Sequence, residues 1–198
     1  MEKRLLIFDL GIGEIVAGAY IDGTQESVLR LDPESEWEAW IEEFISDHLA
    51  TGRCIGVAAT STSEQSTALK TLAAKLDLDL QFVDHPPLPT AIAKLYPGRD
   101  AIVIHVNSEL LFTQVRGKEV KEQRAPLSVE TIQTTVATLR EALDNPVVVA
   151  TGHAMSELAA DAASAHLREA LTPLTDAIEP ELSLIGIHAA HMEGETHV

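Results

Sequence analysis

The fold is decided by the stretch from Leu5 to Leu31, which reads LLIFDLGIGEIVAGAYIDGTQESVLRL. Its three apolar runs are separated by a Gly-containing turn and an Asp-Gly turn, a pattern typical of three consecutive antiparallel strands. The stretch from Ala101 to Arg124, AIVIHVNSELLFTQVRGKEVKEQR, follows the same plan with an Arg-Gly turn. Each copy is followed by a helical segment and another short apolar run. The sequence therefore predicts an internally duplicated βββαβα unit.

Helical or strand spacing of the apolar residues predicts the elements that follow each copy. In the first copy these are a helix within 33–50, a strand over 55–59, a helix carrying Leu69 and Leu72, and a strand over 78–83. In the second copy they are a helix capped by Ser128, a strand over 147–150, and helices over 157–171 and 180–191. The last residues, GETHV, are expected to fray.

The boundary between the two copies is marked by DHPPLP, residues 84–89. Three prolines in four positions are expected to exclude a helix or a central strand there. A short helix over 90–96 should follow. We expect an N-terminal lobe over 1–88 and a C-terminal lobe over 89–198 that includes the closing helix.

Composition limits the classes of function. The 198 residues include 14 basic and 31 acidic side chains, a formal net charge of -17. Such a chain is poorly suited to nucleic acid or to anionic membranes, because both require Lys and Arg. The single cysteine, Cys54, lies in an apolar strand pattern and is expected to be buried. With no apolar run near the ~20 residues of a membrane span and no signal-peptide pattern, we expect a soluble, cytoplasmic protein.

Three segments resemble the type III pantothenate kinases, a branch of the actin, sugar-kinase and Hsp70 (ASKHA) superfamily. They are DLGIGEIVAGAYIDG, VVVATGHAMSEL and ELSLIGIHAA, beginning at Asp9, Val147 and Glu181. Their order and approximate spacing match that family across most of the chain. The resemblance implies an α/β actin-like ATPase fold of two ribonuclease-H-like lobes. It also implies ATP with Mg²⁺ as phosphoryl donor, pantothenate as acceptor, and a homodimer.

The resemblance also implies a set of site residues. A Gly-containing turn lets backbone N–H groups approach phosphate oxygens, and a carboxylate at a strand end can hold Mg²⁺. Asp9 would be the magnesium ligand, although an Asp that caps a turn is the competing interpretation. The implied nucleotide- and phosphate-binding residues are Asp9, Gly11, Gly13, Asn107, Ser108, Thr151, Gly152 and His153.

Several positions depart from the family pattern. Glu14 stands where the family has Asn-Thr, and a carboxylate ~4 Å from a phosphate costs about 4 kcal/mol at an effective dielectric near 20. The second phosphate loop begins with His105 and lacks the family's metal-binding Asp; His105 is either a replacement contact or an ordinary hydrogen-bonded side chain. Pro86 and Pro87 stand at the positions of the catalytic Asp and Arg, which leaves Asp84 as the nearest candidate base.

Three functions remain open on these residues. We expect a diverged pantothenate kinase-like protein that is non-catalytic or weakly active, a nucleotide- or anion-binding or regulatory homodimer. The first alternative is an active ATP-dependent kinase that uses Asp9 on magnesium and Asp84 as base. The second is a scaffold that binds no ligand and dimerises through the helix over 128–143. His188 and His191 could hold a metal, but an exposed polar C-terminus is the preferred interpretation of that cluster.

Overall fold

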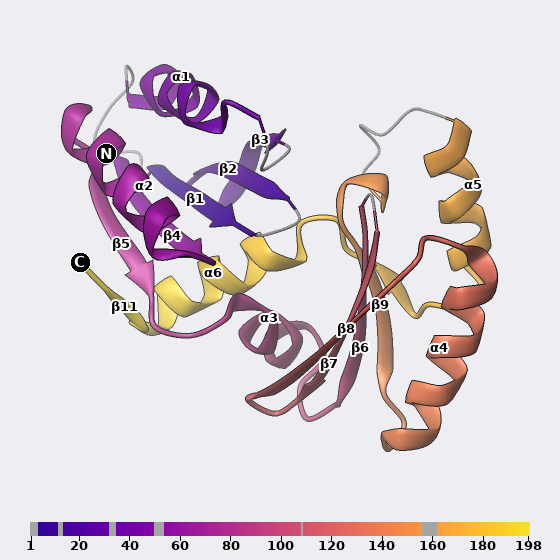
Figure 1. The fold of residues 1–198 in the computed structure, drawn as a ribbon. Helices are drawn as coiled ribbons and strands as arrows, with labels where there is room; N and C mark the ends of the chain where they lie inside the picture. The colour runs from indigo at the N-terminus through magenta and orange to yellow at the C-terminus, as the bar shows by residue number, and fades with distance from the viewer. Residues whose placement is uncertain (1–3, 12–13, 32–34, 50–53, 108, 156–161) are drawn as a thin grey trace. The chain divides into compact units, whose positions relative to one another are not determined.

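The computed structural model describes residues 4–11, 14–31, 35–49, 54–107, 109–155 and 162–198. They form two compact units (Figure 1). The first consists of Met1–Pro87 and Ser183–Val198, and the second of Leu88–Leu182. Each unit is built on its own sheet, so the two are described separately.

The first unit contains a six-stranded sheet of order β11-β5-β4-β1-β2-β3. Strands β1, β2 and β3 form an antiparallel meander, β1 pairs in parallel with β4, and β4 pairs in parallel with β5. The strands are β1 (Arg4–Leu10), β2 (Ile15–Ile21), β3 (Thr24–Leu31), β4 (Cys54–Thr60), β5 (Asp79–Val83) and β11 (Thr196–His197).

The second unit repeats this arrangement in a five-stranded sheet of order β10-β9-β6-β7-β8. Its meander β6-β7-β8 and its parallel strands β9 and β10 match β1-β2-β3, β4 and β5 of the first unit. The strands are β6 (Ala101–Val106), β7 (Leu110–Arg116), β8 (Glu119–Ala125), β9 (Val147–Thr151) and β10 (Ala177–Ile178). The predicted duplication and α/β class are therefore confirmed.

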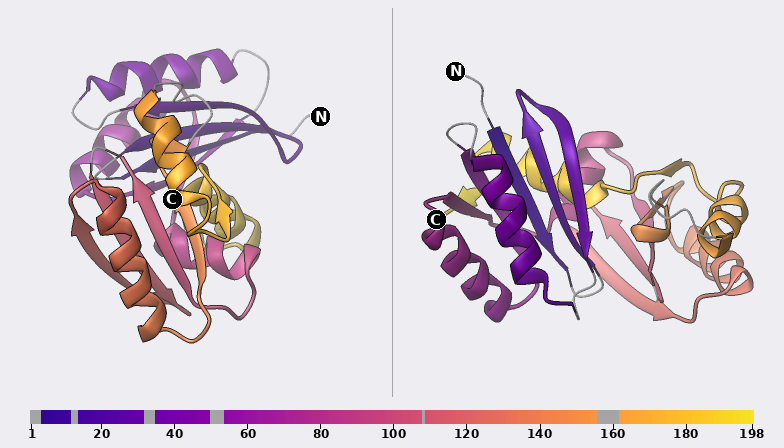
Figure 2. Two further views of the ribbon diagram at one scale, coloured as in Figure 1. Left: turned by 90° about the vertical axis from the view of Figure 1, so that its right-hand side faces the viewer. Right: turned by 90° about the horizontal axis from the view of Figure 1, so that it is seen from above.

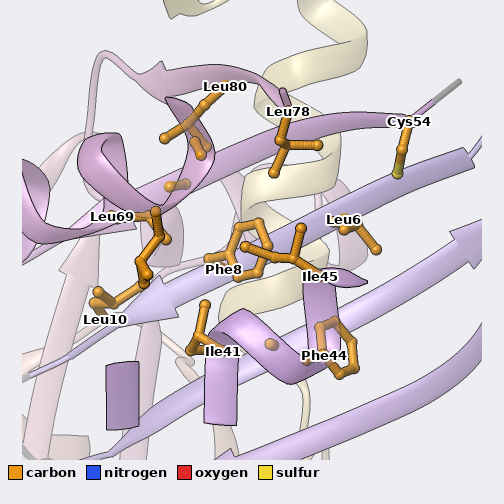
Figure 3. Close-up of a cluster of buried hydrophobic side chains, with 14 of the residues drawn as sticks. Leu6, Phe8, Leu10, Ile41, Phe44, Ile45, Cys54, Leu69, Leu78 and Leu80 are labelled. Carbon is orange, nitrogen blue, oxygen red and sulfur yellow. The ribbon is translucent and has the colours of Figure 1, made fainter. Parts of the chain in front are cut away.

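Helices cover both faces of each sheet, because consecutive residues of the central strands β1, β4, β6 and β9 are apolar and point to opposite faces. In the first unit α1 (Trp37–Leu49) and α2 (Ser63–Lys75) pack on the face of Leu6 and Phe8, as Figure 3 shows. The opposite face packs against α6 (Leu182–Glu193).

The second unit has the same three layers (Figure 2). Helices α4 (Val129–Ala142) and α5 (Ala162–Leu171) pack on the face of Ile102 and Ile104. Helix α3 (Pro87–Leu95) packs on the face of Val103. Ser128 caps α4 as predicted, its hydroxyl accepting from the Thr131 N–H at 3.1 Å, and Cys54 is buried. No described helix is long and apolar enough to cross a bilayer.

The closing helix differs from the expectation that it belongs to the C-terminal lobe. From Ser183 onward the chain packs with the first unit. Leu184 and Ile187 enter the cluster formed by Ile7 and Val16. Gly18 makes this approach close, since a Cβ there would lie 2.9 Å from Leu184 Cδ1. Periodicity identifies an amphipathic helix but not which of two similar sheets it covers.

The proline segment was misjudged, because α3 begins at Pro87 and contains Pro89. Both prolines lie in the first helical turn, where the backbone N–H groups have no intrahelical partner to lose.

The expectation of a frayed C-terminus is also wrong. Residues Thr196 and His197 pair with Val83 and Phe82 as strand β11. The Asp84 N–H donates to the carbonyl of Glu195 at 3.1 Å. The tail thus satisfies backbone groups at the otherwise open edge of β5.

Candidate functional site

Asp9 lies near the carboxyl end of β1, opposite Val16 of β2 and Ala59 of β4. It alternates with Phe8 and therefore shares the sheet face of Ile7, the face that α6 covers. The carboxyl ends of the parallel strands β1, β4 and β5 lie along this edge of the sheet, where open α/β sheets commonly bind ligands. The predicted magnesium ligand is thus a strand residue and not the cap of a turn.

The environment of Asp9 raises the pKa of its carboxyl to about 6. Burial is the largest cause, because it disfavours the ionised form. A hydrogen bond from the Ser183 side chain at the start of α6 acts in the opposite direction, and the nearby charge of Glu14 raises the pKa further. A divalent cation would relieve both causes of the increase, and one or two carboxylates with water are a normal protein contribution to a Mg²⁺ site. The Asp9 carboxylate is therefore chemically suited to the Mg²⁺ that the sequence resemblance implies.

Glu14 is held by Arg30 of β3. The guanidinium Nη1 lies 2.9 Å from the carboxylate Oε1, and only 4% and 15% of the two side chains are exposed. Because Arg30 is opposite Val16, it lies on the same face as Asp9. The Arg30 guanidinium therefore compensates part of the Glu14 charge that was expected to repel a phosphate.

Arg30 was missed as a site residue, although the repeat contains a signal for it. In the second unit Glu109 precedes β7 as Glu14 precedes β2, and Arg124 of β8 lies 2.8 Å from Glu109. The Glu–Arg separation is nearly the same in both copies of the sequence, 16 residues in the first and 15 in the second. Ser183 leaves no comparable signal, because its partner Asp9 is far away in the chain.

Gly11 forms the beginning of the turn after β1. A Cβ there would lie 2.9 Å from the carbonyl oxygen of Glu14, so this turn requires a residue without a side chain. The Gln65 amide donates to the Gly11 carbonyl at 3.4 Å, which connects the turn to α2. The second predicted glycine, Gly13, lies outside the described residues.

His105 occupies in the second unit the position that Asp9 occupies in the first. It lies near the carboxyl end of β6, opposite Leu111 of β7 and Thr151 of β9. Its Nε2 is buried and has no hydrogen-bond partner among the described residues. Burial lowers the pKa of this imidazole to about 4. At neutral pH His105 is therefore uncharged and does not supply the negative charge of a metal-binding carboxylate.

Asn107, Thr151 and Gly152 meet at the same edge of the second sheet. Gly152 has φ +100, and a Cβ there would lie 2.7 Å from Asn107 Oδ1 and 2.9 Å from the carbonyl of Val106. The Thr151 hydroxyl donates to the Pro180 carbonyl at 3.2 Å. The structure thus brings these three predicted residues together, next to His105.

Two further predicted residues are only partly covered by the structure. The His153 backbone begins a short 3₁₀ helix, His153–Met155, and the placement of its side chain is not described. Ser108 lies outside the described residues.

Asp84 is not brought to Asp9. Its Oδ1 lies 2.8 Å from Nδ1 of His197, and both side chains are exposed. His197 is opposite Phe82, which belongs to the face covered by α1 and α2, whereas Asp9 lies on the α6 face. Since β4 separates β1 from β5, the two strands are also roughly 10 Å apart.

The C-terminal histidines His188 and His191 do not form a metal site with other described residues. The His188 ring packs 5.3 Å from the Tyr20 ring. Within the described ranges, no three His, Cys, Asp or Glu side chains lie close enough to hold a metal ion.

Comparison with known proteins shows the fold. No protein-family model and no curated protein sequence matches the chain. The ethanolamine utilization protein EutJ of Carboxydothermus hydrogenoformans is similar in structure, with a TM-score of 0.56 and 11% identity over 94% of this chain and 89% of that one. A Ppx/GppA family member from Aquifex aeolicus gives a TM-score of 0.41 at 12% identity, covering 97% and 89%. YeaZ from Pseudomonas aeruginosa gives 0.46 at 12% identity, covering 98% and 95%. With its duplicated five-strand order, the chain has the actin-like ATPase fold.

Proposed function

We propose that this chain is a nucleotide- or anion-binding regulatory protein with the actin-like ATPase fold, one that has lost efficient phosphoryl transfer. The observation that carries the proposal is the difference between two equivalent positions. The first unit keeps a carboxylate, Asp9, at the end of its first strand, and the second unit has the neutral His105. The first unit therefore keeps an acidic side chain at this position and the second unit does not.

Binding is supported by the surroundings of Asp9. Mg²⁺, when bound, would compensate the negative charge of a phosphate ligand. Asp9 would hold that cation while Ser183 orients the carboxylate. The ion pair with the Arg30 guanidinium would keep the Glu14 carboxylate away from the ligand.

Weak or absent catalysis is supported by the position of Asp84. Phosphoryl transfer depends on positioning and on charge compensation by metal and donors. Asp84 is paired with His197 on the other face of the sheet. It is therefore poorly placed to take the proton from the hydroxyl of a substrate that would be phosphorylated near Asp9. Pantothenate, the acceptor implied by the sequence resemblance, is therefore proposed to be at most a poor substrate.

The test is ligand-induced stabilisation. ATP with Mg²⁺ at ~100 times its dissociation constant should add about 2.7 kcal/mol, enough to raise Tm by several degrees. Replacing Mg²⁺ with EDTA, or Asp9 with Ala, should remove most of the shift. Asp79→Ala, an exposed carboxylate at the start of β5, is the matched control and should retain it. No shift in the wild-type protein would refute binding.

The second measurement is turnover. We expect little or no steady-state ADP formation with ATP, Mg²⁺ and pantothenate. Turnover that Asp84→Ala abolishes would refute the non-catalytic proposal in favour of the kinase. We also propose the homodimer that the sequence resemblance implies, which predicts twice the monomer mass in sedimentation equilibrium, with or without ligand.

A further inference from the structure

Strand β8 forms one edge of the second sheet (Figure 1). It pairs with β7 on one side, and no described strand pairs with it on the other. The side chains from Glu119 to Arg124 are all exposed, on both faces of the sheet. An exposed edge presents backbone N–H and C=O groups that can pair with another chain.

The equivalent edge of the first unit is better protected. Strand β3 pairs with β2 through a register shift between Ala19 and Tyr20, and a bulge of this kind twists an edge away from a partner. Residues 27–31 of β3 are also partly buried. Strand β8 has neither feature, because its register with β7 is continuous along its whole length. A regular, exposed edge therefore distinguishes the second unit from the first.

The turn that connects β7 to β8 determines which backbone groups point outward. This turn has two residues, so the flanking pair, Arg116 and Glu119, is hydrogen-bonded. Hydrogen-bonded and non-hydrogen-bonded pairs alternate along an antiparallel ladder. The N–H and C=O groups of Val120, Glu122 and Arg124 therefore point away from β7, toward the free edge.

A second copy of the chain fits this edge in one register. When two copies of one strand pair antiparallel about a twofold axis, the residue on the axis lies opposite its own copy. Only an axis through Lys121, Glu122 or Gln123 lets most of β8 pair with its copy. With either of the first two on the axis, like charges lie opposite each other, which is destabilising.

The register with Gln123 on the axis is complementary in charge and in hydrogen bonding. Two uncharged amides then lie opposite each other, and Glu122 of each copy lies opposite Arg124 of the other. Glu122 and Arg124 also have outward backbone groups, so the same pairs exchange backbone hydrogen bonds. Arg124 is exposed beside Glu109, which leaves its guanidinium accessible to a second carboxylate.

Helix α4 offers less to a second copy. Its apolar residues Ile132, Val136 and Leu139 are buried in the core of the second unit. The helix therefore presents a largely polar surface, with little apolar area that a dimer could bury.

We propose that two copies of this chain dimerise by antiparallel pairing of their β8 strands, with Gln123 on the twofold axis. The two five-stranded sheets then form one continuous sheet. This interface rests on the homodimer of the proposed function and deepens it by naming the surface. Because the paired segment is short, the dimer is weak and dissociates on dilution.

The first test exchanges charges in the full chain and measures the dimer dissociation constant by sedimentation equilibrium. Glu122→Arg and Arg124→Glu each place like charges opposite one another, and each should raise the dissociation constant at least about 10-fold. The double variant restores opposite charges and should dimerise as the wild-type protein does. Glu119→Arg is the matched control, since it changes the net charge as Glu122→Arg does but lies outside the paired residues 121–125. It should not weaken the dimer.

The second test measures the register. The Cα atoms of a non-hydrogen-bonded antiparallel pair are ~4.5 Å apart, within the range of a disulfide. Gln123→Cys should therefore form a covalent dimer in oxidised glutathione, seen on a non-reducing gel. Lys121→Cys is the control on the same face of β8, but its two copies would be roughly 13 Å apart and should stay largely unlinked. The native Cys54 is buried and does not compete.

Different results would overturn different statements. A wild-type dimer that neither single charge variant weakens would lie on another surface, such as α4, and would overturn the β8 interface alone. Equal crosslinking of Gln123→Cys and Lys121→Cys would overturn the proposed pairing. A wild-type protein that is monomeric at every concentration would refute the homodimer itself.

Nucleotide binding is measured separately. The thermal shift with ATP and Mg²⁺ depends on Asp9 and should be unchanged in the β8 variants. Its absence in the wild-type protein would refute binding and leave the β8 interface standing, whereas a shift that disappears together with the dimer would overturn the separation of the two.

Discussion

The guanidinium of Arg30 lies 2.9 Å from the carboxylate of Glu14 in a nearly buried ion pair. The matching pair of the second unit, Arg124 and Glu109, is similarly close at 2.8 Å. However, 57% of the Arg124 side chain and 52% of the Glu109 side chain are exposed. The duplication therefore offers the same ion pair in two environments. Removing one partner of a buried pair leaves an uncompensated charge, whereas an exposed charge is solvated by water.

We predict that Arg30→Ala lowers the free energy of unfolding by about 3–5 kcal/mol. Arg124→Ala should lower it by at most about 1 kcal/mol. Urea denaturation monitored by circular dichroism measures both values. If the free energy of unfolding fell equally in the two variants, burial would not be the reason for the contribution of the Arg30–Glu14 pair.

Gly186 of α6 allows the helix to pass very close to Pro87, since a Cβ at this position would overlap the Pro87 carbonyl. We predict that Gly186→Ala destabilises the protein by about 2 kcal/mol. The overlap with backbone costs more than the gain of about 1 kcal/mol in helix propensity. Met192→Ala, at an exposed position of the same helix, should change the unfolding free energy by less than about 0.5 kcal/mol. A Gly186→Ala variant that is more stable than the wild-type protein would show that the gain in helix propensity exceeds the cost of the overlap with Pro87.

Local patterns in the sequence were sufficient for most of the fold. Asp22-Gly23 follows the second apolar run of the first copy and Arg116-Gly117 follows the second run of the second copy, which is why the duplication could be recognised. The Ser128 cap is also a local signal, because its partner is only three residues away.

Non-local contacts account for what was missed. His197 pairs with Asp84, 113 residues earlier, and nothing near either residue indicates the other. The same holds for Ser183 and Asp9. Arg30 is an intermediate case, because its partner is 16 residues away and the pair is repeated in the second copy.

The pair of Asp84 and His197 should contribute little to stability. Both side chains are exposed, so Asp84→Asn and His197→Ala should each lower the free energy of unfolding by less than about 1 kcal/mol. In a double-mutant cycle at pH 6, the coupling energy should also be below about 1 kcal/mol. A loss of 3 kcal/mol or more in either single variant would indicate that the tail depends on this contact.

The raised pKa of Asp9 predicts a specific pH dependence. A carboxyl with a pKa of about 6 in the folded protein and 3.8 when unfolded destabilises the fold above pH 6. The penalty is complete above the folded value, decreases as the pH falls through it, and disappears below the unfolded value. Asp9→Asn should therefore stabilise the protein by about 2–3 kcal/mol at pH 7.5.

At pH 4 the same substitution should have little effect, because Asp9 is then protonated in the folded protein. Thermal or urea unfolding at the two pH values measures the difference. Asp79→Asn, an exposed carboxylate, is the control and should show no such dependence. An Asp9→Asn variant that is less stable than the wild-type protein at pH 7.5 would contradict a destabilised carboxylate.

The net charge of -17 predicts that salt stabilises the protein. Repulsion among the excess carboxylates favours expansion of the chain, and salt screens it with a Debye length that falls from ~10 Å at 0.1 M to ~3 Å at 1 M. Raising KCl from 0.1 to 1 M at pH 7.5 should therefore raise Tm by several degrees. Close to pH 5, protonation removes part of the negative charge, and the salt effect should become smaller. An increase in Tm of the same size at both pH values would show that KCl acts through apolar burial instead of charge screening.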